Sequence, residues 1–310
     1  MKILVSYLGA VAFAVLSLLL VFPPDYFFFS NLQAFALPFA VIYFLIAFCI
    51  FLFRKVRIYK LIFISCLLGS VLISSLFIPY LLVYHYVTAK NEDNNFSVGN
   101  FNIWYENPKK LATIEKILEA NVDLLGLEEI STVWNTLLQQ HLAKKYPYHF
   151  SIPIDDSYFG IAVFSKYPFK KIAQHDWAGY AGIAGVVSAP FGEVAFAVTH
   201  FAVPKESYRY EIRKLQFLEV ADYLNKHQDY KIALGDFNTV SWSMEVTQFQ
   251  HNANLKDSRK GIAPTFPASL PMIPLDYVFY SPNFQCIDFE TIKTHSDHLG
   301  IVARFSSSKR

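Results

Sequence analysis

Polar residues suited to phosphoester chemistry stand at the ends of apolar, strand-like runs in the second part of this chain. In order they are Asn102 in G-N-F-N, Glu129 in L-L-G-L-E-E, His200 in V-T-H-F, Asp236 and Asn238 in L-G-D-F-N, Asp276 in P-L-D-Y-V-F, and Asp297 with His298 in H-S-D-H-L-G. Carboxylates and amides are hard oxygen ligands for a divalent cation, and imidazoles transfer protons. Because a sheet can make its strand ends converge, these motifs predict a metal-assisted site for phosphoester cleavage.

Each acidic motif also has a plainer explanation. A strand-end acid such as Glu129 more often caps a following helix than binds a cation. Glu128 beside it points to the opposite face if the strand continues, and the pattern alone does not decide which of the two enters a site. Asp236 and Asn238 share one face of an extended segment, where they can orient an attacking water and hold a phosphate oxygen, but G-D and N-T also favour a simple turn.

The two candidate histidines differ in context. A lone histidine such as His200 is more often structural than catalytic. His298 follows Asp297 directly, so Asp297 can bind a metal while a different acid, Asp276, orients the imidazole through a hydrogen bond. The sequence contains no phosphate-binding P-loop, no H-E-x-x-H, no C-x-x-C pair and no G-x-S-x-G elbow, which excludes those catalytic classes.

Short β-rich runs alternate with helical patterns after residue 95. Strands are expected at 96–103, 122–127, 161–165, 182–189, 193–201, 230–235, 275–280 and 299–305. Helices are expected at 109–120 and 205–227, the second with an apolar face of Ile212, Leu215, Leu218 and Leu224. This alternation predicts a layered α/β (α+β) domain, a four-layer αββα sandwich of two mixed β-sheets with outer helices.

The first part of the chain is far more apolar. Three windows, Ile3 to Phe22, Ala34 to Phe53 and Leu61 to Tyr84, lack Asp, Glu, Lys and Arg and are long enough to span a bilayer. The first window is also compatible with a signal peptide. However, it has no A-x-A-like cleavage site at its end, and two more apolar windows follow it. Because the spans carry no charged side chain, transport through them is a weak alternative.

Charge and cysteine usage place the large domain. The loop between the second and third windows carries Arg54, Lys55, Arg57 and Lys60, whereas the first loop has no Lys or Arg, so the domain after the third span is expected outside the cytoplasm. Cys286 is the only cysteine of that domain, which excludes a disulfide within it. A net charge of +2 is too small to indicate nucleic acid by itself.

Taken together, the six motifs resemble the endonuclease/exonuclease/phosphatase (DNase-I-like) family over about residues 96–306. The resemblance implies that Asn102, Glu129 and Asp297 hold Mg²⁺ or Mn²⁺, and that Asp236 with Asn238 positions the nucleophile and phosphate. It further implies that His298, oriented by Asp276, contacts the phosphate or acts as acid or base, with His200 opposite. Glu128 stands where the family often has Gln, which is expected to add a negative charge.

The three apolar windows followed by this domain look like a bacterial membrane-anchored subgroup, the YafD-like proteins. The expected organisation is a membrane anchor over 1–87, a linker over 88–95 and a catalytic domain over 96–310, in the inner membrane with the domain in the periplasm. The expected partners are the bilayer and a phosphate ester, for which nucleic acid, phospholipid headgroups and small phosphate esters all remain open, and no obligate protein partner is expected. The alternative from another class is a non-catalytic tethered binding or scaffold protein that retains the fold.

Overall fold

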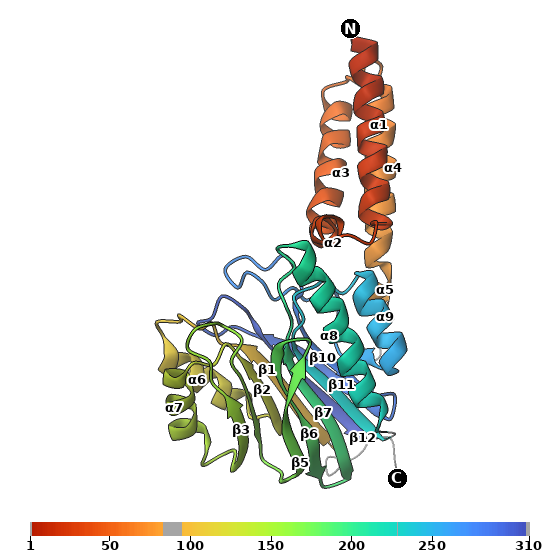
Figure 1. Ribbon diagram of the computed structural model, residues 1–310. Helices are drawn as coiled ribbons and strands as arrows, with labels where there is room; N and C mark the ends of the chain where they lie inside the picture. Colours follow the sequence, from red (N-terminus) through yellow and green to blue (C-terminus); the bar gives the residue numbers. More distant parts are fainter. Residues whose placement is uncertain (1, 83–94, 228, 308–310) are drawn as a thin grey trace. The chain divides into compact units, whose positions relative to one another are not determined.

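The computed structural model describes residues 2–82, 95–227 and 229–307, which form two compact units (Figure 1). The first consists mainly of residues 2–82, and the second contains nearly all the other described residues. Val83 and Tyr84, the end of the third expected span, lie outside the described residues, as does the expected linker except for Asn95.

The first unit is entirely helical. Its elements are α1 (Lys2–Val21), α2 (Phe27–Ala34), α3 (Ala36–Leu52), α4 (Lys60–Ser74), the 3₁₀ turn η1 (Ser75–Phe77) and α5 (Ile78–Leu82). The segments Leu4–Val21 and Lys60–Leu81 are long and apolar enough to cross a membrane. The helices α2 and α3 are bent by 61° at their junction and give a third span only if the pair counts as one.

Two side-chain hydrogen bonds of this unit join different helices, while many apolar side chains are exposed. The Tyr43 hydroxyl donates to the Phe13 carbonyl at 3.0 Å, and Ser70 Oγ donates to the Ala40 carbonyl at 2.9 Å. A Cβ at Gly69 would lie 2.4 Å from Ser17 Oγ, so this glycine permits close approach of α1 and α4. Small residues and interhelical hydrogen bonds of this kind are typical of helices packed in lipid.

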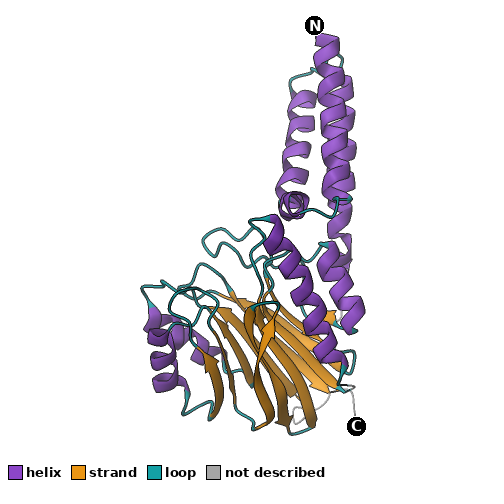
Figure 2. Cartoon of the chain, viewed as in Figure 1, coloured by secondary structure: helices purple, strands orange, loops and turns teal. Residues whose placement is uncertain are grey.

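The second unit consists of two six-stranded sheets with helices on their outer faces (Figure 2). The first sheet has the order β11-β12-β1-β2-β4-β3, and the second has the order β5-β6-β7-β8-β10-β9. The strands are β1 (Asn95–Asn102), β2 (Leu124–Glu128), β3 (Tyr148–Ile152), β4 (Ile161–Ser165), β5 (Phe169–Trp177), β6 (Tyr180–Ala189), β7 (Gly192–His200), β8 (Tyr230–Asp236), β9 (Lys256–Asp257), β10 (Asp276–Tyr280), β11 (Phe284–Ile292) and β12 (Gly300–Ser307). The helices are α6 (Lys110–Ala120), α7 (Thr132–Leu142), α8 (Ser207–Asn225) and α9 (Met244–Ala253).

Alternating apolar residues produce the layers of this unit. On β7, Phe196 and Val198 point into the core between the two sheets, whereas Ala197 points outward to the helices. Ile114 of α6 and Trp134 of α7 pack on the outer face of the first sheet, and α8 and α9 cover the second. The expected four-layer sandwich is confirmed, because side chains of period two bury both faces of each sheet.

The strand register brings chemically important residues to one end of each sheet. In the antiparallel pair β8–β10, Asp236 lies opposite Asp276, and in the parallel pair β7–β8 it lies opposite His200. In the first sheet, Asn102 of β1 lies opposite Glu128 of β2. Gly235 has φ +149°, and a Cβ there would lie 1.8 Å from the Thr199 carbonyl oxygen, so only glycine fits immediately before Asp236.

The predicted apolar face of α8 is partly wrong. Leu215 and Leu218 are about half exposed, at 49% and 51%. The buried face instead carries Arg213 and Gln216 beside Phe217, since Arg213 forms a buried ion pair with Glu245 of α9. A buried charge requires a partner distant in sequence, which helical periodicity does not reveal.

Candidate active site

One half of the site opens toward solvent and is built around Glu129. Its Oε2 accepts a hydrogen bond of 2.7 Å from the Tyr105 backbone, and its Oε1 accepts one of 3.0 Å from Asn102 Nδ2. Burial raises the pKa of Glu129 above its ordinary value, and the carboxylate of Asp297 raises it further. These two carboxylates therefore lie close enough to repel one another, which is an arrangement that a cation would stabilise.

Backbone conformation explains why Glu129, rather than Glu128, faces this opening. Glu129 has φ +68° and Asn238 has φ +49°, both left-handed, so the chain turns directly after β2 at Glu129 and two residues after β8 at Asn238. Glu128 is still part of β2 and is fully buried, with its Oε2 accepting from Asn100 Nδ2 at 3.2 Å. Adjacent glutamates thus have different surroundings.

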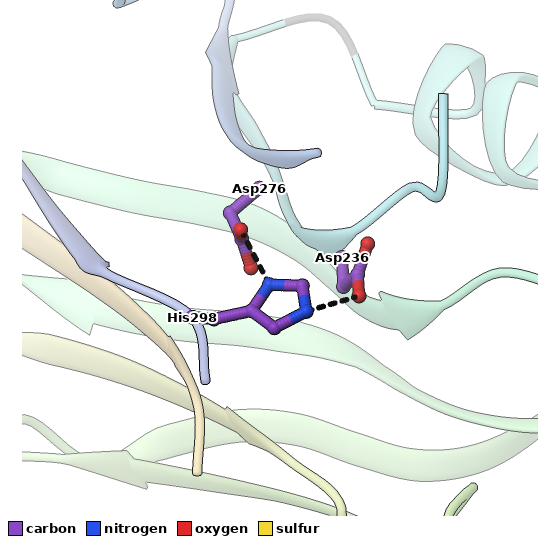
Figure 3. Close-up of side chains that lie close together, drawn as sticks. All are labelled: Asp236, Asp276 and His298. Atoms are coloured by element: carbon purple, nitrogen blue, oxygen red, sulfur yellow. Dashed lines mark hydrogen bonds and ion pairs between the residues drawn. The ribbon is translucent and has the colours of Figure 1, made fainter. Parts of the chain in front are cut away.

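The other half of the site is buried and centres on His298 (Figure 3). His298 Nδ1 lies 2.9 Å from Asp276 Oδ2, and His298 Nε2 lies 3.8 Å from Asp236 Oδ2. Burial by itself lowers the pKa of His298, but the carboxylates of Asp276 and Asp236 outweigh it and raise this pKa above its ordinary value. An imidazolium held between two acids is consequently the favoured form.

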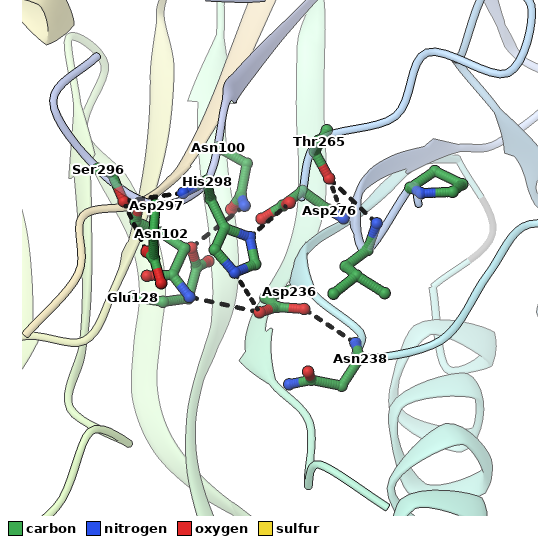
Figure 4. A network of polar contacts seen from close by, with 12 residues as sticks. Asn100, Asn102, Glu128, Asp236, Asn238, Thr265, Asp276, Ser296, Asp297 and His298 are labelled. Atoms are coloured by element: carbon green, nitrogen blue, oxygen red, sulfur yellow. Dashed lines mark hydrogen bonds and ion pairs between the residues drawn. The ribbon is translucent and has the colours of Figure 1, made fainter. Parts of the chain in front are cut away.

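Asp236 is where the two halves meet (Figure 4). Its Oδ2 accepts from Asn102 Nδ2 at 3.3 Å and lies 3.7 Å from His200 Nε2, while its Oδ1 accepts from the Asn238 backbone at 2.9 Å. Burial raises the pKa of Asp236, and the nearby Asp276 raises it further. Burial also lowers the pKa of His200 to about 4, with the charge of His298 acting in the same direction, so His200 is neutral near pH 7.

The surroundings of Glu128 disfavour the additional negative charge that the sequence comparison with the family predicts at this position. Burial raises the pKa of Glu128 well above its ordinary value, and the carboxylates of Asp276 and Asp236 reinforce this shift. The protonated acid is therefore favoured. A protonated glutamic acid has the shape and neutrality of glutamine, the residue that the family often has here.

Several supporting residues were not predicted from the sequence. Ser296 Oγ donates to the Asn102 carbonyl at 2.7 Å and accepts from the His298 backbone at 3.2 Å, so it fixes the loop before β12 against the end of β1. Arg213 donates to the Asn238 carbonyl. Ser296 is part of the S-D-H motif, so the sequence contains a signal for its role. Nothing in the sequence near Arg213 indicates that this side chain contacts the Asn238 carbonyl.

A cavity of about 680 Å³ adjoins the half of the site around Glu129. Glu129 and Asp297 contribute to its wall, together with aromatic side chains and Arg209. Asp236, Asp276 and His298 do not line this cavity and are almost inaccessible, at 2%, 0% and 5% exposure. A substrate in this cavity would therefore meet Glu129 and Asp297 first.

Two groups of residues are able to hold a cation. Asp236, Asp276 and His298 can each offer one atom, all within 4.8 Å of one another, which makes them a possible metal site. Glu129 and Asp297 form the second group with Asn102, whose Oδ1 accepts from the Trp104 backbone at 3.1 Å and keeps a second lone pair. No Lys or Arg pairs with Glu129 or Asp297 within the part of the chain that the structure describes.

The αββα sandwich and the acids, amides and histidines at its strand ends define the class of DNase-I-like proteins. The sequence model of the Endonuclease/Exonuclease/phosphatase family matches residues 99–298, and the chain belongs to this family. Members of the family are hydrolases that act on phosphoester bonds. A search of curated proteins by sequence gives no match.

Solved structures of low sequence identity share this fold. An endonuclease/exonuclease/phosphatase from Beutenbergia cavernae has 20% identity and a TM-score of 0.59, covering 69% of this chain and 72% of that one. The D. rerio TDP2 complexed with a single-strand DNA product has 16% identity and a TM-score of 0.58 over 69% and 99% of the chains. Sphingomyelinase C from Streptomyces griseocarneus has 17% identity and a TM-score of 0.52 over 69% and 99%. At these identities the likeness shows the fold alone.

Proposed function

We propose that this protein is a membrane-anchored, divalent-metal-dependent enzyme that hydrolyses a phosphodiester by in-line attack of water. The observation that carries the proposal is the hydrogen bond between His298 and Asp276 beside Asp236. Buried acids and imidazoles with shifted pKa values are the groups that general acid–base catalysis requires. A non-catalytic scaffold has no use for this costly burial of charge.

We assign Mg²⁺ or Mn²⁺ to Glu129, Asn102 and Asp297 rather than to the group around His298. The donor set consists of oxygens, which these ions prefer, and it opens into the cavity. His298 is less suitable because an imidazolium protonated on both nitrogens has no lone pair for a metal. When bound, the cation would neutralise charge on the phosphate oxygens and the departing oxygen.

The residues of the chain divide the proton transfers between them. Asp236, whose pKa is raised by burial, accepts a proton from the attacking water, and the Asn238 amide orients the phosphate. The imidazolium of His298, held by Asp276, donates a hydrogen bond to the phosphoryl group, with neutral His200 on the other side. Water forms the new P–O bond as its proton passes to Asp236, the ester P–O bond breaks, and the alcohol leaves with the proton of the His298 imidazolium.

The helical unit supports attachment to a membrane. Two or three of its helices are apolar enough to span a bilayer, and the basic loop containing Arg54, Lys55 and Arg57 favours a cytoplasmic position for that loop. We propose that the catalytic domain faces the periplasm of a bacterial inner membrane. Protease treatment of spheroplasts, which should cleave the domain without lysis, tests this orientation.

The proposed activity is tested with the full chain in detergent and bis(p-nitrophenyl) phosphate as substrate. Hydrolysis should stop when EDTA is added and return with Mg²⁺ or Mn²⁺. Replacement of both Asp236 and His298 by alanine should abolish the reaction while the circular dichroism spectrum is retained. Hydrolysis that survives both replacements would contradict the proposed function, and complete inactivity of the native protein with both metals would favour a scaffold.

A further inference from the structure

The cavity beside Glu129 has an unusual balance of charge for a phosphodiesterase. Five carboxylates contribute to its wall, namely Glu106, Glu129, Asp155, Asp156 and Asp297, against one guanidinium, that of Arg209. Arg209 is partly exposed and its Nε donates to the Tyr208 hydroxyl at 2.9 Å. Even with a divalent cation bound, carboxylates outnumber positive charges.

This balance is unfavourable for a nucleic acid strand. Binding of such a polyanion depends mainly on lysine and arginine contacts to successive phosphates. A strand that placed one phosphate near Glu129 would bring its neighbouring phosphates toward the acids of the cavity wall. The cavity instead suits a substrate with a single phosphodiester.

Three of the five carboxylates already have a role, and two do not. Glu129 and Asp297 belong to the proposed metal site, and Asp155 accepts from the Thr132 backbone at 2.8 Å, at the start of α7. Glu106 and Asp156 are exposed, and neither side chain has an ion pair or hydrogen bond among the residues that the structure describes. They are therefore free to interact with a bound ligand.

Aromatic side chains line the same cavity. They are Trp104, Tyr105, Tyr158 and Phe159. The Phe159 ring lies 4.9 Å from that of Tyr158 and 5.0 Å from that of His200, so the aromatic wall continues to the catalytic groups. Aromatic faces together with carboxylates are the surroundings in which proteins bind organic ammonium groups.

We propose that this cavity binds a phosphodiester of which one arm carries an ammonium group, a zwitterionic ester rather than a nucleic acid. The proposal rests on the phosphodiesterase function proposed above. Glu106 and Asp156 attract the ammonium group, the aromatic wall contacts its alkyl surface, and the phosphate lies beside Glu129. Choline and ethanolamine esters, whether lipid headgroups or soluble esters, share this chemistry.

The test compares substrates on the full chain in detergent. We expect p-nitrophenyl phosphorylcholine to have a higher kcat/KM than bis(p-nitrophenyl) phosphate, and a single-stranded oligonucleotide to be the poorest substrate. The double variant Glu106→Gln, Asp156→Asn should lower the ratio of the choline to the neutral substrate about fivefold, as expected for the loss of partly exposed charge pairs. Glu115→Gln with Asp222→Asn, which removes the same charge from exposed positions outside the cavity, should leave the ratio unchanged.

Distinct outcomes separate this proposal from the proposed function. Hydrolysis of bis(p-nitrophenyl) phosphate with no choline preference, or a preference for the oligonucleotide, would overturn the ammonium assignment alone. Binding is measured independently on the inactive His298→Ala variant, where phosphocholine should quench tryptophan fluorescence at lower concentration than inorganic phosphate, and equal quenching would also overturn the assignment. Phosphatidylcholine micelles and glycerophosphocholine then distinguish a lipid from a soluble ester.

Discussion

The two halves of the site contain similar residues in very different surroundings. Around Glu129 the carboxylates open into a cavity, whereas Asp236, Asp276 and His298 are nearly inaccessible to water. In the open half a ligand or ion can be exchanged with solvent. In the buried half a charge is stable only beside its partner, so its geometry and its protonation are fixed together. This difference supports our proposal that one half binds metal and substrate while the other transfers protons.

Removal of the central buried groups is expected to have the largest effect. His298→Ala or Asp236→Ala should lower kcat for bis(p-nitrophenyl) phosphate by about 10³-fold or more, since a general acid or base contributes about 10²- to 10⁴-fold. Steady-state kinetics at saturating Mg²⁺ measure this effect. A loss that appears only in KM would place these residues in binding and so remove the distinction between the halves.

The variant Asp276→Asn is expected to cost somewhat less, about 10²-fold in kcat, and to change the pH profile. The carboxylate of Asp276 helps to raise the pKa of His298, so its neutralisation lowers that pKa. Activity that needs the imidazolium is present below this pKa and lost above it, so the alkaline limb of the pH–rate profile should move to lower pH. An unmoved alkaline limb would contradict the role of His298 as the charged partner.

The variant Glu129→Gln probes the open half and should act chiefly on the metal. Loss of a charged ligand is expected to raise the Mg²⁺ concentration for half-maximal activity about 10- to 100-fold, with much of kcat recovered when Mg²⁺ is increased. Titration of activity with Mg²⁺ gives this value. Loss of kcat without recovery would show that Glu129 acts in the chemical step instead.

The smallest effect is expected for the neighbouring variant Glu128→Gln. Burial favours the protonated form of Glu128, so the neutral amide replaces a neutral acid of the same shape. Activity and the thermal unfolding midpoint should both stay close to those of the native protein, with kcat changed by about threefold at most. A large loss would show that Glu128 carries charge in the working enzyme.

The sequence predicted the layers and most strands because burial on both faces leaves a strong apolar pattern. The strand expected at 161–165 coincides with β4, and the one expected at 230–235 differs from β8 by one residue. The exposed strand β5 was missed, since Lys170, Lys171 and Gln174 interrupt its apolar run. Strands at a sheet edge bury less and so leave a weaker pattern.

The site was predictable in composition but not in arrangement. Strand ends identified Asp236 and Asp276, yet only the antiparallel register of β8 and β10 shows that they lie opposite one another. The contact between Arg213 and Asn238 depends on the packing of α8, whose buried face helical periodicity predicts only in part. Long-range polar contacts arise from tertiary structure, and local sequence carries little information about them.

The antiparallel pairing of β1 with β12 joins Asn95 to Ser306 and thereby the two ends of the catalytic domain. Asp297 and His298 stand immediately before β12, so the pairing of β12 with β1 brings them to Asn102 at the end of β1, far earlier in the chain. Such a long loop closes slowly compared with local structure. The candidate site is therefore complete only when β12 has paired with β1, because this pairing holds Asp297 and His298 beside the other site residues.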